Sequence, residues 1–244
     1  MRALQGAGMT VRRGLAFAAV ASVSMALTAC DVAMSPNPTL TSADASKQLV
    51  LKPGLWRSST CADSAPATAS CPKLEVSADG VSGLVAQKNV PPNLADLYAR
   101  PQPYVIADGH PPVLQLRYPT GGALLVKGPD AVTPADQDKP FYVFLGLEPQ
   151  ARDAFGYVVR FKAWPVLCGP PAKVRIGQEG AAKGSPYPGP TQSPFEGVTP
   201  TGLSCTIKDR AALHHAADLS RTYVGPLMEL HWVGDADSAA SGSP

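Results

Sequence analysis

Apolar and polar residues alternate with a period of two along several stretches of this chain. In residues 155–163 every odd position is apolar, whereas Arg160 and Lys162 occupy even ones. Such alternation is typical of a strand with one buried and one solvated face, as in antiparallel sheets. Residues 141–147 are apolar on both faces and predict a central strand. Further strands are predicted at 54–61, 74–77, 104–107, 114–118, 123–126, 203–208 and 228–232.

Helical patterns are few. Residues 209–220 have an apolar side and a polar side, and Asp209 can cap the first turn, so this stretch predicts an amphipathic helix. A shorter helical turn is expected at 93–98. The 26 prolines and 22 glycines favour turns over helices. The predicted fold class is therefore all-β: an antiparallel β-sandwich or a partly closed β-barrel, with one minor helix in the C-terminal half.

The N-terminal region has the pattern of an export signal. Arg12 and Arg13 precede an uncharged, largely apolar run at 14–29, which ends in Leu27-Thr28-Ala29-Cys30. This ending resembles the lipobox of bacterial lipoproteins. The resemblance implies cleavage before Cys30 and an acyl lipid, such as palmitate, on that cysteine. The alternatives are a plain secretory signal cut elsewhere and an uncleaved anchor, although the run is shorter than the roughly 20 residues that span a bilayer. Met9 is an alternative start to Met1.

The lipobox resemblance sets the expected organisation and location. Residues 1–29 would be the signal peptide, 30–48 the lipidated cysteine with a flexible, Ser- and Thr-rich tether, 49–233 a β domain, and 234–244 a disordered tail. The protein would lie on the periplasmic side of the cell envelope, held to the membrane by the lipid on Cys30. Asp31, directly after it, favours the inner membrane over the outer membrane.

Processing also changes the charge. The first 29 residues contain three arginines and no acidic residue, so their removal takes the formal net charge from +2 to −1. The mature chain therefore has no basic excess, and we expect no nucleic-acid partner.

The four other cysteines predict disulfides in an oxidising compartment. Four cysteines allow three pairings, of which proximity in the sequence favours Cys61 with Cys71 and Cys168 with Cys205. The second bridge would close the Pro- and Gly-rich loop predicted at 169–202. No CxxC pair is present, so we expect disulfides rather than a metal site.

Candidate catalytic residues are sparse, and we expect neither enzymatic activity nor a cofactor. His214 and Asp218 are one helical turn apart, with His215 beside them, and such a pair can form a general base. A solvated helix face is the commoner explanation of that spacing. Glu229 and His231 share one face of the last predicted strand, which is more often an exposed sheet face. The SxxK letters from Ser70 to Lys73 are interrupted by Pro72.

Aromatic residues suggest two further features. Trp56, Trp164 and Trp232 fall in strand patterns and are expected in the core. Tyr187 lies among prolines that would hold the chain extended and expose its ring, which suits a recognition element, although a mobile loop without a partner is the commoner explanation. Gly54-Leu55-Trp56 resembles the GxW motif that opens lipocalin-like barrels. The expected anchor, the spacer after it and the lack of a recognisable catalytic constellation predict a non-catalytic binding or scaffold module with an envelope protein as partner. The alternatives are a lipocalin-like carrier of a small apolar ligand and an envelope hydrolase with an unrecognised site.

Overall fold

The computed structural model describes residues 32–61, 73–86, 99–118, 139–170, 193–201, 204–226 and 228–235. Its strands and helices are β1 (Met34–Ser35), the short 3-10 helix η2 (Ser42–Asp44), β2 (Gly54–Ser58), β3 (Lys73–Val76), β4 (Ser82–Ala86), β5 (Gln102–Ala107), β6 (Val113–Tyr118), β7 (Phe141–Arg152), β8 (Val158–Pro165), β9 (Val198–Thr201), β10 (Ser204–Ile207), α5 (Arg210–Val224) and β11 (Met228–Gly234).

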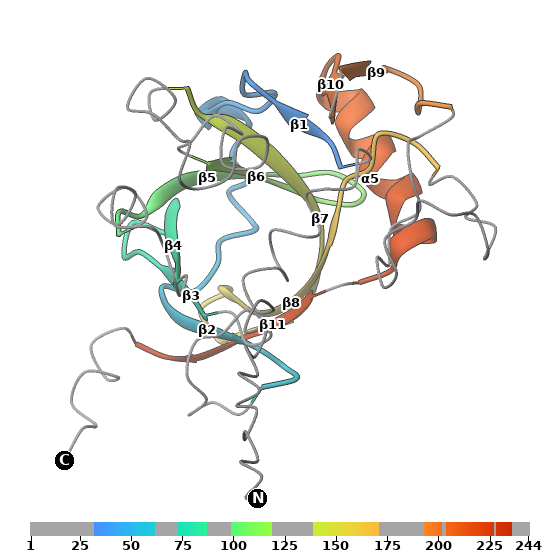
Figure 1. Ribbon diagram of the computed structural model, residues 1–244. Coiled ribbons are helices and arrows are strands. Elements are labelled where there is room, and N and C mark those ends of the chain that lie inside the picture. Colours follow the sequence, from blue (N-terminus) through green and yellow to red (C-terminus); the bar gives the residue numbers. More distant parts are fainter. Residues whose placement is uncertain are drawn as a thin grey trace, which may run out of the picture.

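Eight strands form a closed antiparallel barrel (Figure 1). Each strand from β2 to β8 pairs with its neighbour in the sequence, and β11 pairs with β8 on one side and β2 on the other. The barrel is thus of the up-and-down type. β9, β10 and α5 are inserted between its last two strands, and β1 pairs with the start of β7. The prediction of an all-β fold with one minor helix is confirmed, and of its two forms the barrel is the one found.

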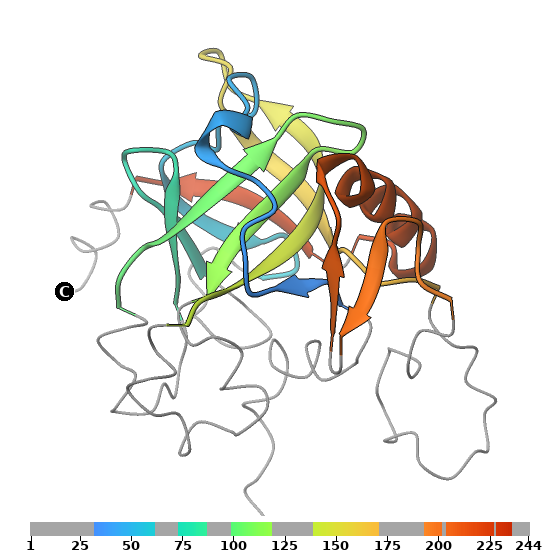
Figure 2. The ribbon, with the colours of Figure 1, turned by 90° about the horizontal axis from the view of Figure 1, so that it is seen from above.

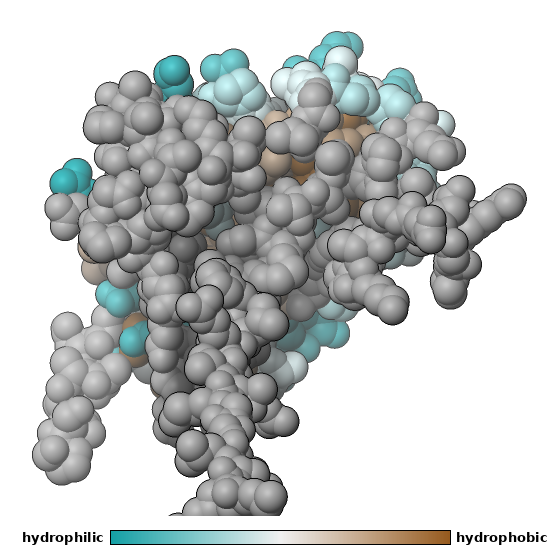
Figure 3. Space-filling model, in the orientation of Figure 1, coloured by the Kyte–Doolittle hydropathy of each residue, from teal (hydrophilic) through white to brown (hydrophobic). Residues whose placement is uncertain are grey.

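Two groups of buried side chains stabilise this arrangement. One lines the barrel interior. The other lies outside the barrel, in the region where α5, the β9–β10 hairpin and the N-terminal segment form an outer layer (Figure 2). In Figure 3 the apolar side chains of this region lie below a hydrophilic upper rim. Because both faces of β6, β7 and β8 are covered, these strands carry apolar residues on both sides rather than on one.

The helix α5 begins where the sequence predicts. The Asp209 side chain accepts a hydrogen bond from the Ala212 N–H at 2.9 Å, which caps the first turn. Leu213, Ala216, Ala217 and Ser220 form the buried face against the barrel wall. Trp164 on β8 joins the two layers, since its indole Nε1 donates to the Ala217 carbonyl at 2.8 Å.

The N-terminal segment differs from the expected flexible tether. Val32, Ala33 and Leu40 are buried in the outer core. Gln115, predicted on a wet face of β6, is also buried, because its side-chain amide pairs with the backbone of Leu40. Residues 32–48 therefore belong to the folded domain. The high Ser and Thr content of this segment suggested a tether, but its few apolar residues pack against the barrel.

Two predicted boundaries also shift. Phe155 and Tyr157 lie in the turn between β7 and β8, with Phe155 86% exposed, so the strand begins only at Val158. β9 lies within the predicted loop 169–202, because Val198–Thr201 pair with β10 in spite of Pro200. The predicted elements at 93–98 and 123–126 and the residues 236–244 of the tail lie outside the described residues.

Candidate functional site

The barrel interior is lined by aromatic and aliphatic side chains in the part of the chain that the structure describes. Trp56 and Phe161 contact each other at a ring-centroid distance of 5.3 Å, and both are buried. An eight-stranded barrel is just wide enough to be filled by side chains or to hold one small ligand. The other buried residues of this interior are Leu51, Val76, Tyr104, Ile106, Leu114, Leu147, Val158, Ala163 and Leu230.

The chain itself crosses one end of the barrel. Within residues 46–53, the Ser46 N–H donates to the Ile106 carbonyl at 2.7 Å, and the Val50 carbonyl accepts from the Val158 N–H at 2.9 Å. The segment thus runs from β5 to β8 before it enters β2. Leu49 and Leu51 pack against the interior from this segment. We call residues 46–53 the end strap.

Two tryptophans hold the end strap in place. Trp56 and Trp232 are directly opposite each other on β2 and β11, and both indole N–H groups donate at 2.9 Å, to the carbonyls of Lys52 and Pro53 respectively. The Lys52 ammonium lies 4.0 Å from the centroid of the Trp232 ring. A cation over an aromatic face is a favourable contact. The GxW resemblance therefore falls at the place where the strap joins the first barrel strand.

Polar groups at the same end are paired. Lys52 Nζ lies 3.0 Å from the Asp153 carboxylate, which also accepts from the N–H groups of Phe155 and Tyr157. Desolvation acts to raise the pKa of Asp153, but these hydrogen bonds outweigh it and the pKa is lowered. Burial raises the pKa of Tyr104, whose hydroxyl donates to the Gly80 carbonyl at 2.8 Å. The Lys52–Asp153 ion pair and the neutral Tyr104 hydroxyl thus stabilise this end of the barrel.

His214, the first candidate general base, has a structural environment. Its Nδ1 is 2.8 Å from the Pro111 carbonyl, and because a carbonyl only accepts, this nitrogen is the protonated one. Arg210 Nε approaches the other ring nitrogen at 3.5 Å. In the part of the chain described, no hydrogen bond or ion pair joins His214 to Asp218, which is exposed, as is His215. The predicted pair is not brought together.

Glu229 and His231 lie on the outer face of the barrel. Glu229 is opposite Lys162, and His231 is opposite Arg57 on β2 and Arg160 on β8. His231 Nδ1 is 3.5 Å from the Ser59 hydroxyl. With Lys73 opposite Arg57, four basic or titratable side chains occupy one row across β3, β2, β11 and β8. The sequence places Glu229 and His231 on one strand face but does not show this row, because the row depends on strand register.

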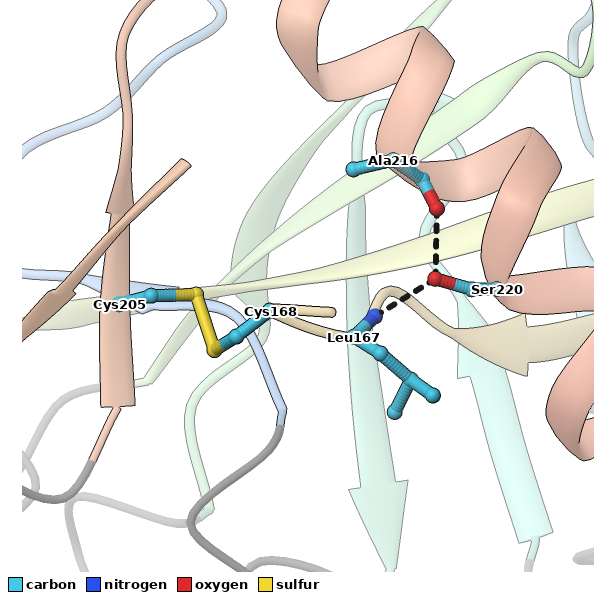
Figure 4. Close-up of a disulfide and its surroundings, with 5 residues drawn as sticks. All are labelled: Leu167, Cys168, Cys205, Ala216 and Ser220. Atoms are coloured by element: carbon cyan, nitrogen blue, oxygen red, sulfur yellow. Dashed lines mark hydrogen bonds between the residues drawn. A yellow bond between two sulfur atoms is a disulfide. The ribbon is translucent and has the colours of Figure 1, made fainter. Parts of the chain in front are cut away.

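The sulfur atoms show one complete bridge among the described residues. Cys168 and Cys205 are disulfide-bonded across a sequence separation of 37, which confirms this predicted pairing (Figure 4). Cys61 is also disulfide-bonded, and Cys71 lies outside the described residues, so the pairing of these two stays a prediction.

Beside the bridge, the buried Ser220 hydroxyl accepts from the Leu167 N–H at 2.8 Å and donates to the Ala216 carbonyl (Figure 4). Nothing in the sequence pattern pointed to Ser220, because it lies on the helix face expected to be apolar.

The remaining candidate residues cannot be placed: Cys30, Ser70 and Tyr187 lie outside the described residues. Within the described ranges, no group of three or more His, Cys, Asp or Glu side chains is placed to hold a metal ion. Within them, too, no helix has the length and apolar character needed to cross a membrane.

Comparison with protein-family models, with curated proteins and with solved structures finds no match to this chain. The class that the structure defines is thus that of an eight-stranded up-and-down β-barrel with an outer helix.

Proposed function

We propose that this chain is a lipid-anchored lipoprotein of the bacterial cell envelope, whose barrel is a non-catalytic binding or scaffold module. The observation that supports a non-catalytic role most directly is the environment of His214. Its Nδ1 bonds to the Pro111 carbonyl in the β5–β6 loop, and its other ring nitrogen contacts Arg210, whose guanidinium donates to the Asp108 carbonyl of the same loop. A general base needs a free lone pair within reach of its substrate. The lipobox at residues 27–30 supports the anchor.

The anchor is tested by metabolic labelling with a palmitate analogue in a bacterial host. The wild type should carry the label and sediment with membranes, whereas Cys30→Ser should lose the label. Cys205→Ser is the matched control, since it removes a different cysteine and should retain the label. Persistent labelling of Cys30→Ser would contradict the proposal.

The binding role is tested by crosslinking in intact cells followed by mass spectrometry. A scaffold module should crosslink reproducibly to one envelope protein through residues on its outer surface. Phe155 at the β7–β8 turn and Arg160 on β8 are suitable positions for a photoreactive residue, because both side chains are exposed. Recovery of the protein without any specific crosslink from either position would count against the role.

A second candidate is a lipocalin-like carrier of a small apolar ligand. It is favoured by the up-and-down order of the eight strands, with Trp56 in the first strand beside a closed end. Titration with a fluorescent fatty acid tests this candidate through energy transfer from tryptophan. Saturable transfer that an unlabelled fatty acid competes away would favour the carrier, and transfer without saturation would exclude it.

A further inference from the structure

The first described residues bind directly to the barrel wall. Ala33 N–H donates to the Val166 carbonyl at 2.8 Å, and Val32 forms an isolated bridge with Leu167. Met34 and Ser35 then pair with β7 as β1. Val32 and Ala33 are 2% and 0% exposed, so the chain is already part of the fold at residue 32.

This position has a consequence for the anchor, and the inference rests on the proposed lipidation of Cys30. Only Asp31 lies between Cys30 and Val32, so two residue steps join them, and an extended chain spans at most about 3.6 Å per step. The lipid-bearing residue would therefore lie within about 7 Å of a buried, hydrogen-bonded point of the barrel wall. This distance is too short for a flexible tether between the membrane and the domain.

We propose that the barrel wall around Val32 and Leu167 is a membrane-contacting surface, which rests on the lipid bilayer in a defined orientation. The partner of this surface is the bilayer into which the acyl chains of Cys30 insert. Val166 lies between Ala33 and Phe144, since it also donates to the Phe144 carbonyl at 3.0 Å. The anchor thus joins the wall beside the first half of β7.

The attachment is reinforced from both sides. Cys168, which follows Leu167, is bonded to Cys205 of β10, and the Leu167 N–H is bonded to Ser220 of α5. A force on the lipid would therefore be carried to the hairpin and to the helix as well as to β7. The surface near the anchor consequently includes the last turn of α5, where Tyr223 is 48% exposed one turn beyond Ser220.

The two most useful positions for a test are Tyr223 and Phe155. Tyr223 is on the anchor side, and a tyrosine at a membrane interface is a common arrangement. Phe155 lies at the β7–β8 turn, and the part of β7 between Phe144 and Arg152 alone extends for about 25 Å. Both side chains are exposed, which allows labelling at either position; Tyr223 also stacks on the Phe195 ring at a centroid distance of 6.2 Å, so the thermal unfolding of each labelled variant is compared with that of the wild type.

The experiment uses the full-length acylated protein in vesicles of phosphatidylethanolamine and phosphatidylglycerol that contain a spin-labelled quencher lipid. Tyr223→Cys and Phe155→Cys each carry the same fluorophore. We expect quenching at position 223 to exceed that at 155 at least threefold. A 20-residue Gly/Ser insertion between Asp31 and Val32 should abolish the difference while acylation and flotation persist.

Equal quenching at both positions, or a difference that the insertion leaves unchanged, would overturn the membrane-contacting surface but not the lipid anchor. Failure of the uninserted protein to acquire acyl chains or to float with vesicles would overturn both. Flotation and acyl labelling are measured on every sample, so the two failures are distinguished.

Discussion

At the scale of single residues, the closed end of the barrel depends on a close backbone approach at Gly54. Its φ of +118° is in a region that residues with a side chain rarely adopt. A Cβ there would lie 2.5 Å from the Gly234 carbonyl and 2.8 Å from Trp232 Nε1, the atom that donates to Pro53. The glycine therefore lets β2 and β11 approach while the tryptophan keeps its hydrogen bond.

Gly54→Ala should destabilise the protein by about 2–4 kcal/mol, because it combines backbone strain with a steric clash. Gly156→Ala is the matched control: its φ is +87°, but nothing lies within 4 Å of the added Cβ, so strain alone should cost about 1 kcal/mol. Urea unfolding of both variants measures the difference. Equal losses would show that the approach to Gly234 is not tightly packed.

At the scale of elements, Gln115 links β6 to the N-terminal segment. Its Oε1 accepts from the N–H groups of Thr39 and Leu40 at 2.8 Å each, and its Nε2 donates to the Leu40 carbonyl at 2.9 Å. The Gln115 side chain thus provides the hydrogen bonds that a neighbouring strand would otherwise give to the backbone of Thr39 and Leu40. A buried polar side chain with all these partners contributes to stability, whereas its loss leaves backbone groups without partners.

Gln115→Leu should cost about 2–3 kcal/mol, because three buried backbone groups lose their hydrogen bonds while the side-chain volume is kept. Amide hydrogen exchange should accelerate at Thr39 and Leu40 more than in the barrel strands. Gln150→Leu is the control, since Gln150 is exposed on β7 and bonds only to Glu148. Unchanged protection of Leu40 in Gln115→Leu would contradict the assigned role.

At the scale of the whole molecule, the Cys168–Cys205 bridge joins the barrel to the layer outside it. Cys168 follows the end of β8, and Cys205 is the buried centre of the outer hairpin. β9, β10 and α5 lie between the barrel strands β8 and β11 in the chain. The bridge gives this inserted part a covalent link to the barrel in addition to its two chain ends. It thereby fixes the outer layer against the wall to which the N-terminus binds.

Replacing Cys168 and Cys205 together by serine should destabilise the protein by about 4 kcal/mol, the loop-entropy value for a separation of 37 residues. Guanidinium unfolding of the oxidised wild type and the double variant measures the loss. Non-reducing peptide mapping serves as the control, because it verifies the bridge in the wild type. An unchanged unfolding midpoint in the variant would mean that packing alone holds the outer layer.

Several elements follow from local signals in the sequence. Alternation identified β6, β8, β10 and β11, the Asp209 cap located the start of α5, and proximity was sufficient to pair Cys168 with Cys205. Each of these signals depends on residues that are close together in the chain, so it can be recognised without knowledge of the fold.

How these elements meet depends on contacts that no local pattern predicts. Closure of the barrel, the burial of Val32 and Gln115, the strap held by Trp56 and Trp232, and the row formed by His231 with its basic neighbours all join residues far apart in the chain. Register and burial arise from packing between distant segments. A polar residue such as Gln115 is therefore predicted to be exposed from the sequence, although the N-terminal segment covers it in the structure. For the same reason the sequence could not show that His214 Nδ1 bonds to the Pro111 carbonyl, which is 103 residues away in the chain.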